Sequence, residues 1–371
     1  MSSAAAAIAP GGLFLTRGHD SAVRLISRAI QTENPPHALL LVGPRGVGKT
    51  TLALDLAAGL MCLVDDAAMR PCRECAACRK VASENHADLH IVRPDGAGEQ
   101  IRITQVQQLT SELSLTAMEG RFRIAIVSSA QRMNPDAQNA LLKTLEEPGP
   151  ATCLILCADD AAPLLATVLS RAARVRLAPM SIEALADLLS KDGTQPSQAR
   201  SLALAAGGRP GLAMTLAQQP HALLARDRIS RTLLDLLDAD RRARLAAAAD
   251  LIADGATLAA ALRGEVPSSS KRLPPLERRR AVTTVLEVWR EVGRDLAITA
   301  QGQGRSVRDL DVLEELQRAA TRVDRVELLR FLDLSDRLAL AIESYASPEL
   351  TLDVLLLSWP RPRVRQATRS A

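Results

Sequence analysis

Aromatic residues are scarce in this 371-residue sequence, which contains three Phe, two Trp and one Tyr. So few rings exclude an aromatic-cored β-sandwich and a surface that stacks nucleic-acid bases on aromatic side chains. No segment reaches the roughly 18 uncharged apolar residues that a membrane span needs. The N-terminal MSSAAAAIAPGG also lacks the positive charge of a signal peptide. We therefore expect a cytoplasmic protein with no membrane segment, rich in helices built from Ala and Leu.

Lysine is scarce as well, because the 46 basic residues include only Lys49, Lys80, Lys143, Lys191 and Lys271. The net charge of +4 permits contact with DNA without requiring it. In a reducing compartment the six cysteines favour metal binding or burial over disulfides. At roughly 100–200 residues per domain, the length predicts two or three domains.

The first half of the chain has the pattern of an α/β domain. Short apolar runs at 37–42, 89–93, 123–128, 153–158 and 174–177 alternate with helix-like stretches at 20–30, 50–60, 104–115 and 135–146. This alternation predicts a parallel sheet with flanking helices over residues 1–178, with an insertion at 62–78. We expect a small helical lid over 179–220 and an all-helical domain over 221–371. The helices expected beyond residue 178 are 182–189, 198–206, 278–298, 307–319 and 326–345.

One motif is specific for nucleotide phosphates. Residues 43–50 read Gly-Pro-Arg-Gly-Val-Gly-Lys-Thr, which fits G-x-x-x-x-G-K-[ST] directly after an apolar strand and at the start of a helix. The glycines let backbone N–H groups converge on phosphate, the lysine reaches the β- and γ-phosphates, and the threonine holds Mg²⁺. The residues expected in these roles are Gly43, Gly46, Gly48, Lys49 and Thr50. A Gly-rich turn without a ligand is the alternative.

Hydrolysis requires a carboxylate near the metal, and the expected strand at 123–128 ends without one. P-loop ATPases place an acidic residue there, whereas this chain reads Val-Ser-Ser-Ala-Gln at 127–131. Serine hydroxyls neither supply the charge that anchors Mg²⁺ nor act as a base near pH 7. We expect the chain's own ATPase activity to be weak or absent, unless a carboxylate comes from elsewhere in the chain.

Four of the six cysteines have the spacing C-x9-C-x2-C-x2-C, at Cys62, Cys72, Cys75 and Cys78. Four thiolates suit tetrahedral Zn²⁺, and a closed set of four ligands is structural because no position stays open for water. Unrelated free thiols are the alternative. We expect surface or capping roles for the nearby His86 and His90. Cys153 and Cys157 fall in an expected strand, where burial accounts for them.

Five local matches make the sequence resemble a known family. They are Gly18-His19, His37-Ala38-Leu39-Leu40, the four-cysteine insertion, NALLKTLEEP at 139–148, and Leu169-Ser170-Arg171. On these residues the chain resembles the AAA+ clamp-loader proteins of the bacterial DNA polymerase III holoenzyme, and within them the delta-prime branch. In the NALLKTLEEP helix, Glu146 and Glu147 stand at the C-terminus, where the helix macrodipole disfavours carboxylates. Such a break of a local rule marks either a contact site or a solvated helix end.

The resemblance implies a largely non-hydrolysing stator in a hetero-pentameric ring with gamma/tau and delta subunits, which loads a sliding clamp on primed DNA. It implies that Arg171 acts in trans, as an arginine finger on a neighbour's ATP, although Ala172 replaces the family's cysteine. Ala158-Asp159 stand where the family's ATP-hydrolysing subunits carry paired threonines that sense the γ-phosphate. Gly208-Arg209-Pro210-Gly211 stand where those subunits have a helix with a second sensor arginine, so Arg209 is displaced. The resemblance also implies that ATP or ADP still binds with Mg²⁺ weakly held, and that the C-terminal helices form an oligomerising collar.

Two other functions remain open from the sequence. One is a catalytically active gamma/tau-type ATPase of the same family, against which Ser128 and Ser129 argue. The other is a zinc-bearing DNA-binding module, against which the lack of aromatic residues argues. The basic tail at 359–365 is expected to be solvated, with DNA contact as its alternative.

Overall fold

Short apolar runs form a five-stranded parallel sheet in the computed structural model, which describes residues 12–95, 99–265, 273–300, 313–343 and 346–362. The strands lie in the order β2-β3-β4-β1-β5. Their bounds are β1 (Ala38–Val42), β2 (Leu89–Val92), β3 (Arg123–Val127), β4 (Thr152–Ala158) and β5 (Ala173–Arg176). Each strand begins and ends within one residue of its predicted run, so all five predictions are confirmed.

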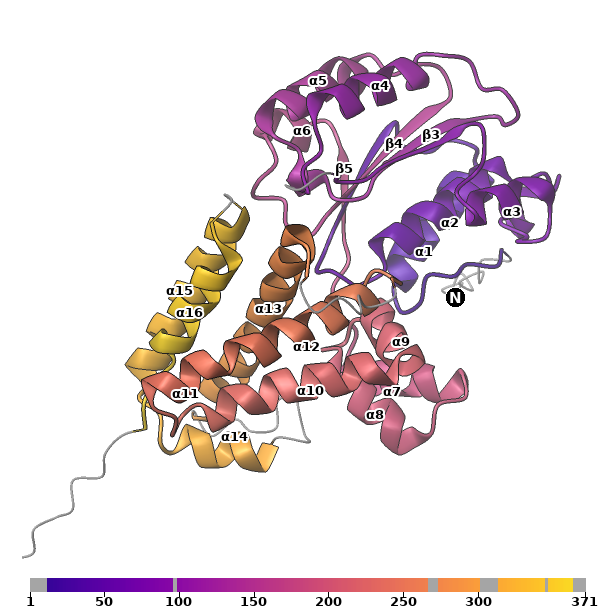
Figure 1. Cartoon of the computed structure of the whole chain (residues 1–371). Helices are drawn as coiled ribbons and strands as arrows, with labels where there is room; N and C mark the ends of the chain where they lie inside the picture. The colour runs from indigo at the N-terminus through magenta and orange to yellow at the C-terminus, as the bar shows by residue number, and fades with distance from the viewer. Residues whose placement is uncertain (1–11, 96–98, 266–272, 301–312, 344–345, 363–371) are drawn as a thin grey trace, which may run out of the picture. The chain divides into compact units, whose positions relative to one another are not determined.

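The three central strands β1, β3 and β4 are buried on both faces, which explains why they are nearly continuous apolar runs. The edge strand β5 is mostly exposed and carries two arginines. Along β1, Leu39 and Leu41 belong to one core cluster, whereas Ala38 and Leu40 belong to the other. Helices cover both faces of the sheet (Figure 1). One face carries α1 (Asp20–Gln31), α2 (Lys49–Met61) and α3 (Ala76–Ala82), and the other carries α4 (Ile103–Leu113), α5 (Pro135–Glu146) and α6 (Ala166–Leu169). The predicted α/β class is confirmed.

The predicted helices of this half are also present. Helix α5 has its predicted bounds, and the Asn134 side chain caps it by accepting the Ala137 N–H at 2.8 Å. Helices α3 and α6 were not predicted, because they have 7 and 4 residues and are too short to show a helical period. Two 3₁₀ turns, η1 (Ala67–Met69) and η2 (Ala130–Arg132), were not predicted either.

Beyond Ser181, the described residues form helices. They are α7 (Ile182–Lys191), α8 (Pro196–Ala205), α9 (Pro210–Gln218), α10 (Pro220–Asp235), α11 (Arg241–Ala246), α12 (Ala248–Ala261), α13 (Pro275–Thr299), α14 (Leu313–Ala320), α15 (Arg325–Glu343) and α16 (Pro348–Ser358). The predicted helices 307–319 and 326–345 correspond to α14 and α15, with residues 307–312 and 344–345 outside the described ranges. Helix α16 was not singled out from the sequence. In the predicted solvated tail, Trp359 and Pro360 are instead buried, whereas Arg361 is exposed. Residues 1–11 and the tail residues 363–365 lie outside the described ranges.

The chain divides into two units by its internal packing. One ends at Ser181 and includes Arg209–Gly211, and the other holds Ile182–Gly208 and the chain from Leu212 onward. In the second unit α13 packs against α10, α12 and α15. Within this unit, Trp289 is fully buried and donates Nε1–H to the Ile229 carbonyl at 3.1 Å. The further boundary near residue 220 stays a prediction. None of the described helices combines the length and hydropathy of a bilayer span.

Candidate functional site

The phosphate-binding motif forms the connection between β1 and α2. Gly46 and Gly48 have φ angles of 80° and 109°, which glycine adopts far more readily than other residues. A Cβ on Gly43 would lie 2.1 Å from the Leu177 carbonyl oxygen, so this position has no room for a side chain. Helix α2 begins at Lys49 without a side-chain cap, and the first N–H groups of such a helix suit a phosphate. The predicted motif therefore fits a nucleotide.

Two segments that are distant in the sequence bind the backbone of this loop. His19, part of the Gly18-His19 match, donates Nε2–H to the Val47 carbonyl at 2.9 Å, since a carbonyl can only accept. Gly211 donates its backbone N–H to the Gly46 carbonyl at 2.8 Å. The loop is thus held from the N-terminal segment and from the residues around the displaced Arg209.

Lys49 is buried, and its ammonium group already has three acceptors within the chain. Nζ donates to the carbonyl oxygens of Gly43 at 2.5 Å and Pro44 at 3.1 Å. It also forms an ion pair with Asp159 Oδ1 at 2.7 Å. An ammonium group has three N–H bonds, so these contacts use all of them. Thr50, the predicted Mg²⁺ ligand, is the next residue of α2 and is half-buried.

Asp159 reaches Lys49 because β4 lies beside β1. Ala158, the last residue of β4, pairs with Val42 at the end of β1, and Asp159 follows directly. Gln131 of η2 holds Asp159 as well: Nε2 donates to Oδ2 at 3.0 Å, and Oε1 accepts the Asp159 backbone N–H at 3.3 Å. This contact was not predicted, since the sequence alone does not say which strand is the neighbour of β1.

The end of β3 has no carboxylate in its sequence. Ser128 turns toward β2, and its backbone N–H and its hydroxyl both donate to the Val92 carbonyl, at 3.0 and 3.2 Å. Ser129 precedes η2 and is half-buried. Neither side chain supplies the charge that anchors Mg²⁺ in P-loop ATPases.

The four clustered cysteines come together at one point. Their Sγ atoms all lie within 4.8 Å of one another, and those of Cys62 and Cys75 are 4.0 Å apart. With Zn–S bonds of about 2.3 Å, a tetrahedral zinc site places its sulfur atoms about 3.8 Å apart. Cys62, Cys72, Cys75 and Cys78 could therefore hold a metal ion after only small movements.

The cysteines differ in acidity. Burial raises the pKa of Cys62 and of Cys78. At Cys75 burial acts in the same direction, but hydrogen bonds from the backbone N–H groups of Leu63 and Cys78 outweigh it and lower the pKa to about 7. Since a metal binds thiolates, it would have to displace protons from Cys62 and Cys78. The two cysteines of β4, Cys153 and Cys157, are fully buried as predicted.

The cysteine insertion is fastened to the helix that follows the phosphate loop. Asp55 of α2 is fully buried, accepts the backbone N–H and the hydroxyl of Thr16 at 2.8 and 2.6 Å, and pairs with Arg73 of the insertion. The Cys78 thiol lies 3.7 Å from the Ala58 carbonyl of the same helix. Helix α2 thus links the loop, the insertion and the N-terminal segment.

Arg171, the predicted arginine finger, lies between α6 and β5. Its Nη2 pairs with Glu146 Oε1 at 2.7 Å, and Nη1 donates to the Thr167 carbonyl at 3.1 Å. About a third of the side chain is exposed (35%). The ion pair accounts for Glu146 at the end of α5, because a cation beside this helix end offsets the unfavourable macrodipole.

Arg171 and the phosphate loop lie at opposite ends of the parallel strands: Arg171 precedes β5, and the loop follows β1. Strands β1 and β5 run parallel, and Ala173 is opposite Leu39, near the start of β1. The loop follows the other end of β1. At about 3.3 Å per residue, the rest of β1 separates the two ends by roughly 10 Å or more. Arg171 is therefore poorly placed to reach phosphates bound in its own chain.

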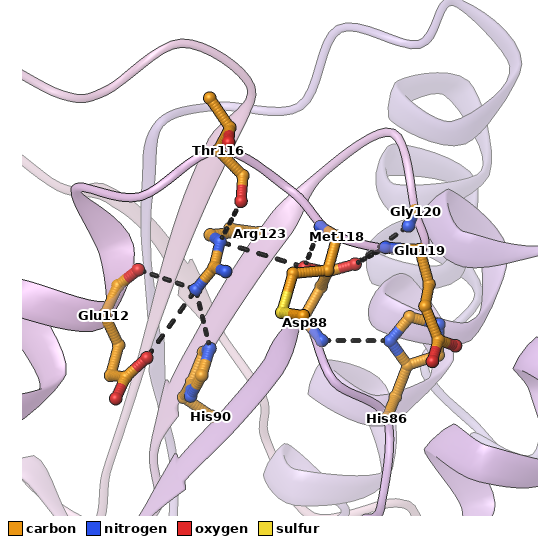
Figure 2. Close-up of polar contacts among 9 residues, drawn as sticks. All are labelled: His86, Asp88, His90, Glu112, Thr116, Met118, Glu119, Gly120 and Arg123. Carbon is orange, nitrogen blue, oxygen red and sulfur yellow. Dashed lines mark hydrogen bonds and ion pairs between the residues drawn. The ribbon is translucent and has the colours of Figure 1, made fainter.

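A third cluster of titratable groups surrounds Asp88, between the insertion and β3 (Figure 2). Asp88 is fully buried and accepts the backbone N–H groups of Met118, Glu119 and Gly120 at 2.7, 2.8 and 2.8 Å. Burial alone would raise the pKa of Asp88, but these N–H bonds and the charge of Arg123 outweigh burial and lower it. The carboxylate holds the turn before β3.

Arg123 of β3 completes this network. Its guanidinium donates to the carbonyl oxygens of Thr116 at 2.9 Å and Glu112 at 2.7 Å, and it lies 3.3 Å from His90 Nε2. His86 accepts the Asp88 N–H through Nδ1 at 3.1 Å. His86 is buried rather than on the surface, and its ring binds the turn before β2 rather than the end of a described helix. Burial lowers the pKa of His86 and of His90, which favours the neutral form of both rings.

The part of the chain that contains the phosphate loop, the cysteines and Arg171 is similar to known proteins. Residues 18–181 match a family model described as DNA polymerase III, delta subunit. The DNA polymerase III subunit delta' of Bacillus subtilis is 37% identical over 181 residues, which are 49% of this chain and 54% of that protein. The subunit delta' of Pseudomonas aeruginosa is 38% identical over 185 residues, 48% of this chain and 55% of that protein. The subunit tau/gamma of Haemophilus influenzae is 27% identical over 230 residues, 60% of this chain and 33% of that protein. The chain therefore spans about half the length of the delta' relatives that it matches.

Proposed function

From the match of residues 18–181 to the DNA polymerase III delta subunit model and from the similarity to subunits delta', we propose that the chain is a largely non-hydrolysing clamp-loader subunit of the delta' kind. It assembles with gamma/tau and delta subunits into a hetero-pentameric ring in the cytoplasm. There it helps to load the sliding clamp on primer–template DNA. In this proposal residues 1–178 form the AAA+ domain, 179–220 its helical lid, and 221–371 the collar that joins the subunits.

The position of Arg171 is the observation that carries this proposal. The guanidinium is partly exposed and lies at the end of the strands opposite its own phosphate loop. This position suits contact with a nucleotide held by a neighbouring subunit better than contact with one in the same chain. On a developing γ-phosphoryl charge, an arginine supplied in trans is worth about 10³–10⁵ in rate. We infer that Arg171 is the residue through which this subunit acts on ATP.

The chain's own site fits binding better than hydrolysis. Gly43, Gly46, Gly48 and Lys49 would hold the phosphates of ATP or ADP, and Thr50 would hold Mg²⁺. The metal is held weakly, because Ser128 and Ser129 supply no charge at the end of β3. This arrangement gives little support to an active gamma/tau-type ATPase.

The cysteine insertion is proposed to hold a structural Zn²⁺. Cys62, Cys72, Cys75 and Cys78 would complete a closed tetrahedral set with no position for water or substrate. The metal therefore acts by stabilising the insertion, which Asp55 and Arg73 fasten to α2.

Reconstitution of the ring tests the role of Arg171. The full chain is mixed with candidate gamma/tau and delta subunits, with clamp and primed DNA present, and the assembly and its ATP turnover are measured. Replacing Arg171 with Ala should slow turnover at the site that it serves by about 10³–10⁵. Assembly and nucleotide binding by this chain should be unchanged.

The matched control is Arg174→Ala, which removes an exposed arginine three residues away in β5. Because Arg171 is still present in this variant, ATP turnover should stay at the wild-type rate. A fully assembled ring that hydrolyses ATP equally well with Arg171→Ala would contradict the proposal.

A further inference from the structure

We propose that Asp159 is an intramolecular counter-ion that competes with nucleotide phosphates for Lys49 and so keeps the affinity of this chain for ATP and ADP low. The inference rests on the proposed nucleotide binding by residues 43–50. It concerns what the chain's own residues do at this site, beyond the function of the ring.

The first step is the count of donors at Lys49. Two of its three N–H bonds go to the carbonyl oxygens of Gly43 and Pro44, within the loop itself. The third goes to Asp159 Oδ1 at 2.7 Å. A phosphate oxygen can bind Nζ only by displacing one of these acceptors. The two carbonyls belong to the loop that shapes the site, so the carboxylate is the acceptor that has to leave.

Exposure indicates the same direction of exchange. The Lys49 side chain is only 8% exposed and is fixed by its surroundings, whereas the Asp159 side chain is 46% exposed and can be reached from solvent. A phosphate that enters from solvent would therefore find the Asp159 carboxylate in the position that the phosphate needs in order to bind Lys49.

Gln131 makes this exchange more costly. Its amide group binds both the carboxylate and the backbone N–H of Asp159, so Asp159 is held beside Lys49 from the end of β3. Gln131, which follows β3, therefore stabilises the side chain that competes with phosphate for Lys49.

Charge adds to the competition. A phosphate that replaced the carboxylate at Nζ would lie within a few ångströms of it, and like charges at that distance repel. Replacing Asp159 with Asn keeps the shape of the side chain and its acceptor oxygen but removes the negative charge. The exchange should then favour the phosphate.

The test is a calorimetric titration of the full chain with ADP and with ATP, each with Mg²⁺ and with a chelator. We expect Asp159→Asn, and a second variant Asp159→Ser, to bind nucleotide about 10- to 100-fold more tightly than the wild type. In either background Lys49→Ala should abolish the gain, since the gain depends on Nζ. The thermal midpoint of each variant, measured alongside, shows that it is folded.

The matched control is Asp160→Asn, which removes the same charge one residue further on. The Asp160 carboxylate accepts the Ala162 N–H and is not bound to Lys49, so the affinity for nucleotide should not rise.

Three outcomes would contradict the proposal. If the wild type and both Asp159 variants bind nucleotide equally well, and Lys49→Ala weakens binding in each, the proposal is wrong but the nucleotide site stands. If the Asp159 variants bind nucleotide more weakly than the wild type with Mg²⁺ but not with the chelator, Asp159 is a metal ligand and the proposal is also wrong. If no variant binds nucleotide at millimolar concentration, both this inference and the proposed nucleotide site are wrong.

Discussion

Buried carboxylates hold loops in this protein by accepting backbone N–H groups. Asp55 accepts from Leu15 and Thr16 of the N-terminal segment, and Asp88 accepts from the turn at Met118. A buried carboxylate without such partners would cost several kcal/mol. Each therefore fixes a backbone conformation, because any other arrangement of the loop leaves its charge unsatisfied.

At the scale of single residues we predict the effect of Asp88→Asn. The amide NH₂ would face backbone N–H donors, so the free energy of unfolding should fall by about 1–3 kcal/mol at pH 7. Since the pKa of Asp88 is lowered in the folded protein, its contribution is present above the unfolded value of about 3.9 and is lost as pH falls through the folded-state pKa. Urea denaturation at several pH values from 7 to 3 measures this.

The control for Asp88 is Asp192→Asn, which changes an exposed residue after α7. It should have a small effect at every pH. A difference between wild type and Asp88→Asn that persists unchanged at pH 3 would contradict the assigned role of the charge.

At the scale of elements, arginines bind the C-terminal ends of helices. Arg171 lies at the end of α5 through Glu146, and Arg244 of α11 lies at the end of α16. The Arg244 guanidinium is buried and donates to the carbonyl oxygens of Leu356, Trp359 and Pro360. A cation is favourable where the last carbonyls of a helix have no partner within it.

We predict that Arg244→Met lowers the free energy of unfolding of the helical unit by about 2–4 kcal/mol, because it leaves buried carbonyl groups without donors. Arg242→Met, on the exposed side of the same helix, should stay within about 0.5 kcal/mol of the wild type. Chemical denaturation followed by Trp fluorescence suits this test, since Trp289 and Trp359 are both buried in this unit. Equal losses in the two variants would show that Arg244 does not cap α16.

At the scale of the molecule, the division into two units predicts separate responses. The cysteine cluster lies in the first unit, whose core contains Cys62 and Cys78. Helix α13 and its neighbours form the core of the second unit. A change at the cysteine cluster should therefore affect the stability of the second unit only weakly.

We predict that the purified chain holds about one zinc ion, which elemental analysis can measure. Removing the metal with a chelator, or replacing Cys72 with Ser, should lower the midpoint of one calorimetric transition and leave the other in place. Cys153→Ser, in β4, is a control that should keep the zinc content. Clearly less than one metal per chain, or a chelator without effect on either transition, would count against a zinc site.

Much of this architecture follows from local sequence. The strands were predictable because a run such as Thr152–Ala158 is buried on both faces and carries only apolar or small residues. The phosphate loop was predictable because its glycines and lysine act within a few residues of one another. Helix α6 was not predictable, since four residues show no period.

The sequence by itself determined the α/β class, the phosphate loop, the cysteine cluster and the family resemblance, because each depends on residues that are close along the chain. Only the tertiary structure decided that Asp159 binds Lys49 and that Glu146 binds Arg171. Those partners are 110 and 25 residues apart in the chain. Their meeting depends on the strand order and on how the ends of α5 and α6 approach each other, which the physics of local segments does not specify.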